Sequence, residues 1–142
     1  MKSLSLKLGV VLIGLMIFGY TEAWGADWIS LGKAEVDIGE FYYDRGSITH
    51  PSKDIVRVWE KIVYSEKGVN TQVEGLGKRY KNLSHTLNLW EVNCVEKQTR
   101  ILQSTAYSKD GTIIISAASS KSEWEFIIPG SVGEGLHSAV CK

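Results

Sequence analysis

The chain ends in Trp124-Glu-Phe-Ile-Ile-Pro-Gly-Ser-Val-Gly-Glu-Gly-Leu-His-Ser-Ala-Val-Cys141, and this stretch says most about the fold. Pro129-Gly130 breaks a preceding strand. Ser131 and Glu134 then form an S-x-x-E capping box, in which each side chain accepts a hydrogen bond from a backbone N–H of the first helical turn. The apolar residues that follow recur at helical spacing and predict a short helix with one apolar face: Val132, Leu136, Ala139 and Val140.

The helix ends at one of only two cysteines in the sequence, Cys94 and Cys141. In an exported chain two cysteines are more often paired than free. Their pairing predicts a C-terminal helix tied to a strand, and closure of a loop of about 48 residues would stabilise the fold by roughly 4 kcal/mol. Because Trp90 and Val92 alternate in step with Cys94, we expect these two side chains to lie beneath the helix.

The N-terminus has the pattern of an export signal. Lys2 and Lys7 give a positively charged start, an apolar run follows over residues 8–20, and small residues come after it at Ala23 and Gly25. The run is shorter than the roughly 20 residues of a transmembrane helix, and no cysteine lies near the cleavage site to carry a lipid. We therefore expect residues 1–25 to be a cleaved signal peptide. Residues 26–142 then form one exported domain without a stable membrane anchor. We expect this domain in the periplasm, at the cell surface or outside the cell.

Charge excludes some classes of partner. The 16 cationic and 16 acidic residues become 14 and 15 once Lys2, Lys7 and Glu22 leave with the signal. A nearly neutral chain without a basic cluster argues against nucleic acid or an anionic membrane surface as the partner, because either would need a concentrated positive patch.

The rest of the domain is predicted to be mainly β, a sheet of about six antiparallel strands. Short alternating or β-branched runs separated by turn residues indicate these strands at residues 28–31, 40–44, 55–64, 83–95, 99–107 and 112–119. Asp110-Gly111 supplies the turn of the last hairpin. The polar, glycine-bearing stretch from Ser65 to Gly77 is interpreted as an irregular connection and a possible binding loop.

One helix covers only one face of a sheet, yet apolar residues fall on both faces. Leu83, Leu87 and Leu89 alternate out of step with Trp90, so they are expected on the opposite face. We interpret this second apolar face in two ways: the sheet curls strongly, or a second subunit covers it in a homodimer.

A set of spaced residues resembles the surface-adhesin protein E-like domain of Gram-negative bacteria over about residues 28–141. The most specific part is the ending W-x4-PGS-V-G-E-x-L-x3-V-C, and the other matching positions are Tyr42-Tyr43-Asp44, Ser47-Ile48, Val58-Trp59, Cys94, Arg100, Tyr107 and Gly111. The resemblance implies a curved antiparallel sheet with a helix tethered across its concave face. It also implies display at the cell surface and binding of host proteins without catalytic residues.

No catalytic, cofactor or metal site is predicted. Ser84 and His85 are neighbours on a strand, so we expect them to face opposite sides and not to form a hydrogen-bonded pair. Glu123 and Glu125 are interpreted as a solvated strand edge. His50, His85 and His137 lack the spacing of a zinc site with the two cysteines and are interpreted as solvated or core-edge side chains, with His137 on the polar side of the helix.

The candidate binding surface consists of Tyr42, Arg57, Trp59 and Lys61, because tryptophan and tyrosine are enriched where proteins bind one another. Arg57 and Lys61 flank Trp59 on one face of a strand, and their stacking over its ring is a structural alternative. The sequence thus predicts an exported, non-catalytic binding or adhesion module with a host or envelope protein as ligand. The alternative is a periplasmic structural or accessory subunit that works as a homodimer or with an envelope partner.

Overall fold

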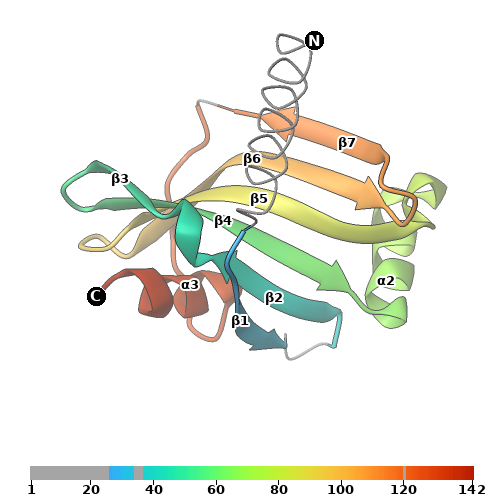
Figure 1. The fold of residues 1–142 in the computed structure, drawn as a ribbon, viewed down its shortest axis with the longest axis horizontal. Helices are drawn as coiled ribbons and strands as arrows, with labels where there is room; N and C mark the ends of the chain where they lie inside the picture. Colours follow the sequence, from blue (N-terminus) through green and yellow to red (C-terminus); the bar gives the residue numbers. More distant parts are fainter. Residues whose placement is uncertain (1–25, 34–36, 120) are drawn as a thin grey trace, which may run out of the picture.

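Alternating apolar runs form one open antiparallel sheet in the computed structural model, which describes residues 26–33, 37–119 and 121–142 (Figure 1). The main path runs in the order β1 (Trp28–Lys33), β2 (Gly39–Asp44), β4 (Ile55–Tyr64), β5 (Leu83–Asn93), β6 (Gln98–Ser108) and β7 (Ile113–Ala118). These are the six strands that the sequence predicted. Two short strands add to them: β3 (Thr49–Ser52) pairs with β4, and β8 (Glu125–Phe126) pairs with β6.

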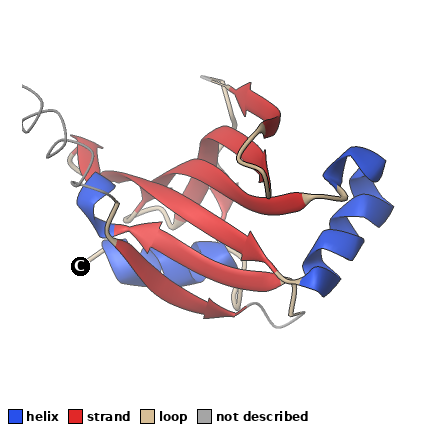
Figure 2. Cartoon of the chain, turned by 45° about the vertical axis from the view of Figure 1, so that its right-hand side comes forward, coloured by secondary structure: helices blue, strands red, loops and turns tan. Residues whose placement is uncertain are grey.

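The strand β4 shows how side-chain alternation divides the sheet. Val56 and Val58 are 3% and 0% exposed on one face, which we call the helix face. The helix α3 (Val132–Val140) packs there through Leu136, which is fully buried against Val58 and Val92. Figure 2 shows α3 lying behind the strands, against one surface of the curved sheet. Trp90 also contacts this cluster, so the predicted placement of Trp90 and Val92 under the helix is confirmed.

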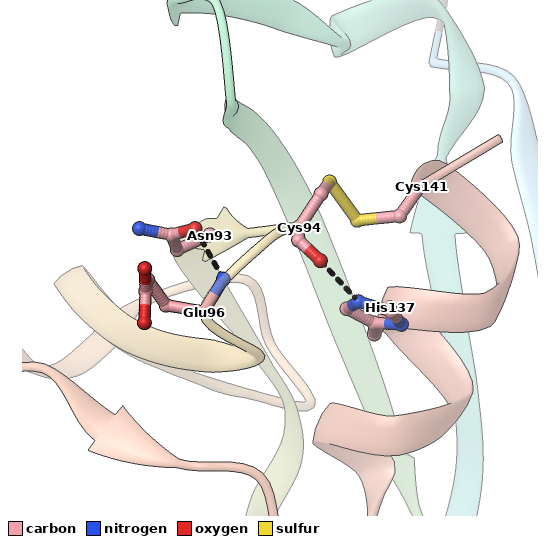
Figure 3. The surroundings of a disulfide bond; sticks show 5 residues. All are labelled: Asn93, Cys94, Glu96, His137 and Cys141. Carbon is pink, nitrogen blue, oxygen red and sulfur yellow. Dashed lines mark hydrogen bonds between the residues drawn. A yellow bond between two sulfur atoms is a disulfide. The ribbon is translucent and has the colours of Figure 1, made fainter.

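The disulfide joins Cys141, the residue after α3, to Cys94, the residue after β5 (Figure 3). The Cα atoms of Cys94 and Cys141 are 5.5 Å apart, and Nε2 of His137 lies 3.1 Å from the carbonyl oxygen of Cys94. His137 is therefore a half-buried link to the sheet, although we predicted it on the polar side of the helix. The strand β5 ends at Asn93 rather than at residue 95, because residues 94–97 turn into β6.

The start of α3 is capped by two side chains. Oγ of Ser131 accepts a hydrogen bond from the backbone N–H of Glu134. The carboxylate of Glu134 accepts from the N–H of Gly130, one residue before the position that a capping box specifies.

The structure corrects the prediction for the stretch from Ser65 to Gly77. This stretch is not an irregular loop but contains a helix, α2 (Glu66–Leu76), followed by a single 3-10 turn, η2 (Lys78–Tyr80). Oγ of Ser65 caps α2 by accepting from the N–H of Gly68 at 3.0 Å. Two glycines and several β-branched residues give the stretch low helix propensity, and packing onto the sheet stabilises it instead. A serine cap followed by Val69 and Val73 at helical spacing was the available signal.

The contacts of α2 place it at the other end of the helix face. Its side chains Val69 and Val73 pack with Tyr80, Leu83 and Ala106, and Tyr64 joins them from β4. Figure 1 shows α2 and α3 at opposite ends of the sheet. The two helices thus share the covering of one face.

The second apolar face is smaller than the sequence predicted. We expected Leu83 on it with Leu87 and Leu89, but a bulge between Leu83 and His85 shifts the register by one residue. A one-residue shift turns a side chain to the other face, and Leu83 is 1% exposed in the cluster under α2. Leu87 and Leu89 stay half-buried on the opposite side, which we call the outward face. None of the described helices is long and apolar enough to span a membrane.

Candidate functional site

The outward face gathers aromatic and cationic side chains from the first three strands of the sheet order. Arg57, Trp59 and Lys61 alternate along β4 on the side opposite Val58, as the sequence predicted. Tyr42 of β2 lies directly across from Lys61 in the strand register. The structure therefore brings Tyr42 and Lys61 into contact and places Trp59 two positions along the same strand.

Lys61 lies against two aromatic rings. Its Nζ is 4.4 Å from the centroid of the Trp28 ring and 5.3 Å from that of Tyr42. Burial lowers the pKa of Lys61 below its usual value. The hydroxyl of Tyr42 donates to the carboxylate of Glu40, and this hydrogen bond raises the pKa of Tyr42. A cation between aromatic rings is held more rigidly than a lysine in free solvent.

Trp28 was missed in the sequence analysis, because only the pairing of β1 with β2 brings it beside Lys61. The cations considered for the Trp59 ring also have other partners: Lys61 contacts Trp28 and Tyr42, and Arg57 pairs with a carboxylate. Trp59 is half-buried opposite Leu89 of β5. Its backbone N–H donates to Oγ of Ser47 at 3.0 Å.

Glu91 organises the neighbouring part of the face. Its side chain is 3% exposed and lies between Arg57 and Arg100, with N–O distances of 2.8 and 2.7 Å. Burial by itself would raise the pKa of Glu91, but hydrogen bonds and charge from the two guanidinium groups bring it below the usual value. Trp124 completes the cluster, because its ring lies 4.4 Å from the Arg100 guanidinium.

We did not predict this cluster from the sequence, because its members meet only through strand register. Glu91 faces Arg57 on one neighbouring strand and Arg100 on the other. Opposite charges directly across a ladder stabilise the pairing. Arg57, which we predicted as a binding residue, is thus held by Glu91 at the border of the face.

The prediction for Ser84 and His85 was wrong. Oγ of Ser84 lies 3.0 Å from Nδ1 of His85, because the bulge at this point departs from regular strand alternation. The His85 ring also stacks on Tyr107, with centroids 4.9 Å apart and planes 11° from parallel. Burial and the charge of Lys61 lower the pKa of His85. Over the described ranges, no group of three or more histidine, cysteine, aspartate or glutamate residues is placed to hold a metal ion.

Glu60 is a second buried carboxylate, on the helix face between the two apolar clusters. It is 1% exposed, and its Oε2 accepts hydrogen bonds from Asn88 Nδ2 and Trp90 Nε1, both at 2.8 Å. Burial raises the pKa of Glu60 despite these two bonds. Because both hydrogen-bond partners of Glu60 are uncharged, we interpret Glu60 as a structural residue of the core and not as part of the binding face.

Comparison with known proteins identifies a family. The family model for surface-adhesin protein E matches residues 28–142. No curated protein matches the sequence. Among solved structures, the chain resembles a selenomethionine form of Haemophilus influenzae protein E with 16% identity and a TM-score of 0.47, over 80% of this chain and 84% of that one. It resembles protein E from non-typeable Haemophilus influenzae with 19% identity and a TM-score of 0.48, over 80% and 74% of the two chains.

Proposed function

The chain belongs to the surface-adhesin protein E family, and on this premise we propose that it binds a protein ligand through the outward face of its sheet. Family membership indicates an exported cell-surface protein that works as an adhesion module and binds host proteins. Beyond family membership, we propose that the domain is non-catalytic, that the outward face is its binding site, and that a signal peptide at residues 1–25 exports it. One observation carries the choice of face: Lys61 lies against Trp28 and Tyr42, with Trp59 alongside on the same strand.

This arrangement has the chemistry of a binding surface. Tryptophan, tyrosine and arginine are enriched among the residues that supply most of the binding energy of protein interfaces, and side chains that are already ordered lose less entropy on binding. Here three strands fix the backbone, and the cation–ring contacts restrict Lys61 before a ligand arrives. The two ion pairs of Glu91, with Arg57 and with Arg100, border the face and help to hold β4, β5 and β6 in register.

The first test is the location of the protein. Intact cells are treated with external protease and blotted for the chain, with a periplasmic protein as control. Loss of the band while the control survives supports surface display. Protection until the outer membrane is permeabilised contradicts it and supports the periplasmic alternative.

The second test is binding of the purified protein to immobilised host serum and cell-surface proteins. We expect Trp59→Ala combined with Lys61→Ala to weaken binding at least about tenfold, since truncation of an interface hot spot costs roughly 2 kcal/mol or more. Leu76→Ala is the matched control, because Leu76 is 58% exposed on α2, away from the face. Equal binding by both variants would show that the ligand does not contact this face.

The periplasmic alternative also has an observation in its favour. Leu87 and Leu89 remain half-buried on the outward face beside Trp59, and a second copy or an envelope partner could cover them. Co-purification of one stoichiometric envelope protein, or a dimer that Leu89→Ser dissociates, would favour this function over adhesion.

A further inference from the structure

Exposed apolar side chains concentrate at one edge of the sheet. Eight large apolar residues are exposed in the described part of the chain, and five of them lie on β7, on β8, just after β8, or on the neighbouring part of β6: Ile101, Ile113, Ile115, Phe126 and Ile128. Phe126 and Ile128 are 76% and 71% exposed. We call residues 113–119 and 121–128 the β7–β8 edge. An apolar concentration of this kind marks a surface that another molecule covers.

The backbone of this edge is available for pairing. The strand β7 is last in the sheet order, with β6 on its inner side. The N–H of Ser119 donates inward to Leu102 O, so by alternation the N–H groups of Ala118 and Ser116 point outward. The strand β7 has no charged residue and no proline, which are the usual protection of an edge. At the opposite edge, β1 has an irregularity between Ser30 and Gly32 and ends in Lys33.

Hollows for side chains lie where β7 gives way to β8. The strand β6 pairs with β7 as far as Gln103 and with β8 from Thr99, so residues 100–102 have neither strand beside them. A hollow of about 190 Å³ is lined by Ile101, Leu102, Ala117 and Ala118, among others. A second hollow of about 240 Å³ is lined by Trp90, Ile101, Arg100 and two carboxylates, Glu123 and Glu125, among others.

The two carboxylates make the two ends of the edge differ in charge. Glu123 and Glu125 are exposed, and the ion pairs among the described residues do not use them. The β7 end of the edge is uncharged. The β8 end carries Lys121 and the two carboxylates, while the nearby Arg100 is already paired with Glu91, so this end keeps an excess of negative charge. A complementary segment is therefore apolar along most of its length and basic at one end.

We propose that the β7–β8 edge is a strand-addition site for an extended segment of another protein. The segment forms main-chain hydrogen bonds with β7, places apolar side chains at alternate positions on the exposed isoleucines and in the hollows, and sets lysine or arginine against Glu123 and Glu125. This site is separate from the outward face around Trp59. An experiment can therefore refute strand addition at the edge without refuting ligand binding at the outward face.

The test uses the purified protein and a fluorescent synthetic peptide that alternates valine and threonine and carries two arginines at one end, made in both orientations. We expect one orientation to bind saturably and to weaken as salt rises. Replacement of the arginines by glutamates, or methylation of alternate backbone nitrogens, should weaken binding at least about tenfold, because a charge pair or several hydrogen bonds are lost. Equal binding by the N-methylated peptide would overturn strand addition.

A variant of the protein tests the same edge from the other side. Ala118→Pro removes an outward N–H without breaking the ladder to β6, and we expect a loss of about tenfold or more. Ala118→Ser keeps the N–H and is the matched control, with equal near-ultraviolet circular dichroism as the check on folding. Unchanged peptide binding by Ala118→Pro would overturn the proposal. So would a dimer of the protein alone that Ala118→Pro dissociates while no peptide binds, since the edge would then belong to a second copy.

Discussion

Removal of the disulfide tests the tethering of α3, the central feature of the fold. We predict that the double substitution Cys94→Ala and Cys141→Ala leaves α3 docked but lowers the free energy of unfolding by about 4 kcal/mol. The helix stays in place because Leu136 is fully buried against Val58 and Val92 and because His137 contacts the Cys94 carbonyl. The loss arises mainly from the greater freedom of the unfolded chain.

The magnitude follows from the length of the loop. Cys94 and Cys141 are 47 positions apart, and the chain-entropy relation gives about 14 cal/mol/K for a loop of that size, or about 4 kcal/mol at 25 °C. A domain of this size is usually stable by about 5–15 kcal/mol. With a urea dependence of about 2 kcal/mol/M, the midpoint should fall by about 2 M.

Urea titrations followed by far-ultraviolet circular dichroism and tryptophan fluorescence measure the change. The native protein reduced with a phosphine is the control and should superpose on the double variant. Leu136→Ala in the cysteine-free background should cost a further 2–5 kcal/mol or so if α3 is still docked. A loss below about 1 kcal/mol on removal of the disulfide, or no further loss with Leu136→Ala, would refute the reasoning.

Three more predictions concern α2 and the two buried carboxylates. Gly68→Ala should destabilise the protein by about 1–3 kcal/mol, because the new Cβ would lie 1.8 Å from the Ile38 carbonyl oxygen. Gly75→Ala, with no atom within 4 Å, should stabilise α2 by up to about 1 kcal/mol; thermal melts that show equal shifts would contradict this packing. Burial raises the pKa of Glu60 above the ordinary glutamate value of 4.5. The contribution of Glu60 to stability is therefore present below that value and lost as pH rises through the folded pKa. As pH rises, the urea midpoint of the native protein should therefore fall more than that of Glu60→Gln. If the urea midpoints of the two proteins changed with pH in parallel, the result would count against a buried carboxylate. The pKa of Glu91 is lowered from the same value, so its contribution is present above that value and lost as pH falls. Glu91→Gln should lower the free energy of unfolding by about 2–3 kcal/mol at neutral pH. This loss is smaller than for a fully buried ion pair, because the Arg57 side chain is 41% exposed. On acidification, the urea midpoint of Glu91→Gln should change less than that of the native protein.

Much of the scaffold was predictable because the signals are local. Alternation along residues 55–64 assigned Val58 to the covered face and Trp59 to the outward one. The Asp110-Gly111 turn forms as expected, with the N–H of Ser108 donating to Thr112 O at 2.8 Å. With only two cysteines to join, the tether of α3 followed from composition.

The candidate site was predictable only in part, because its contacts cross between strands. Alternation placed Arg57, Trp59 and Lys61 on one face, but it could not show that Lys61 contacts Trp28 or that Arg57 pairs with Glu91. Those contacts depend on which residues face one another across the sheet. A single sequence contains no direct record of that register.

The sequence by itself thus determined the six main strands, the turn, the cap at Ser131 and the disulfide, because each depends on neighbouring residues or on a unique pair. Only the tertiary structure decided that residues 66–76 form a helix, since docking of Val69 and Val73 stabilises a segment of weak propensity. It also decided that Leu83 turns to the helix face, because the bulge before His85 shifts the ladder. In each case long-range packing outweighed the local preference of the chain.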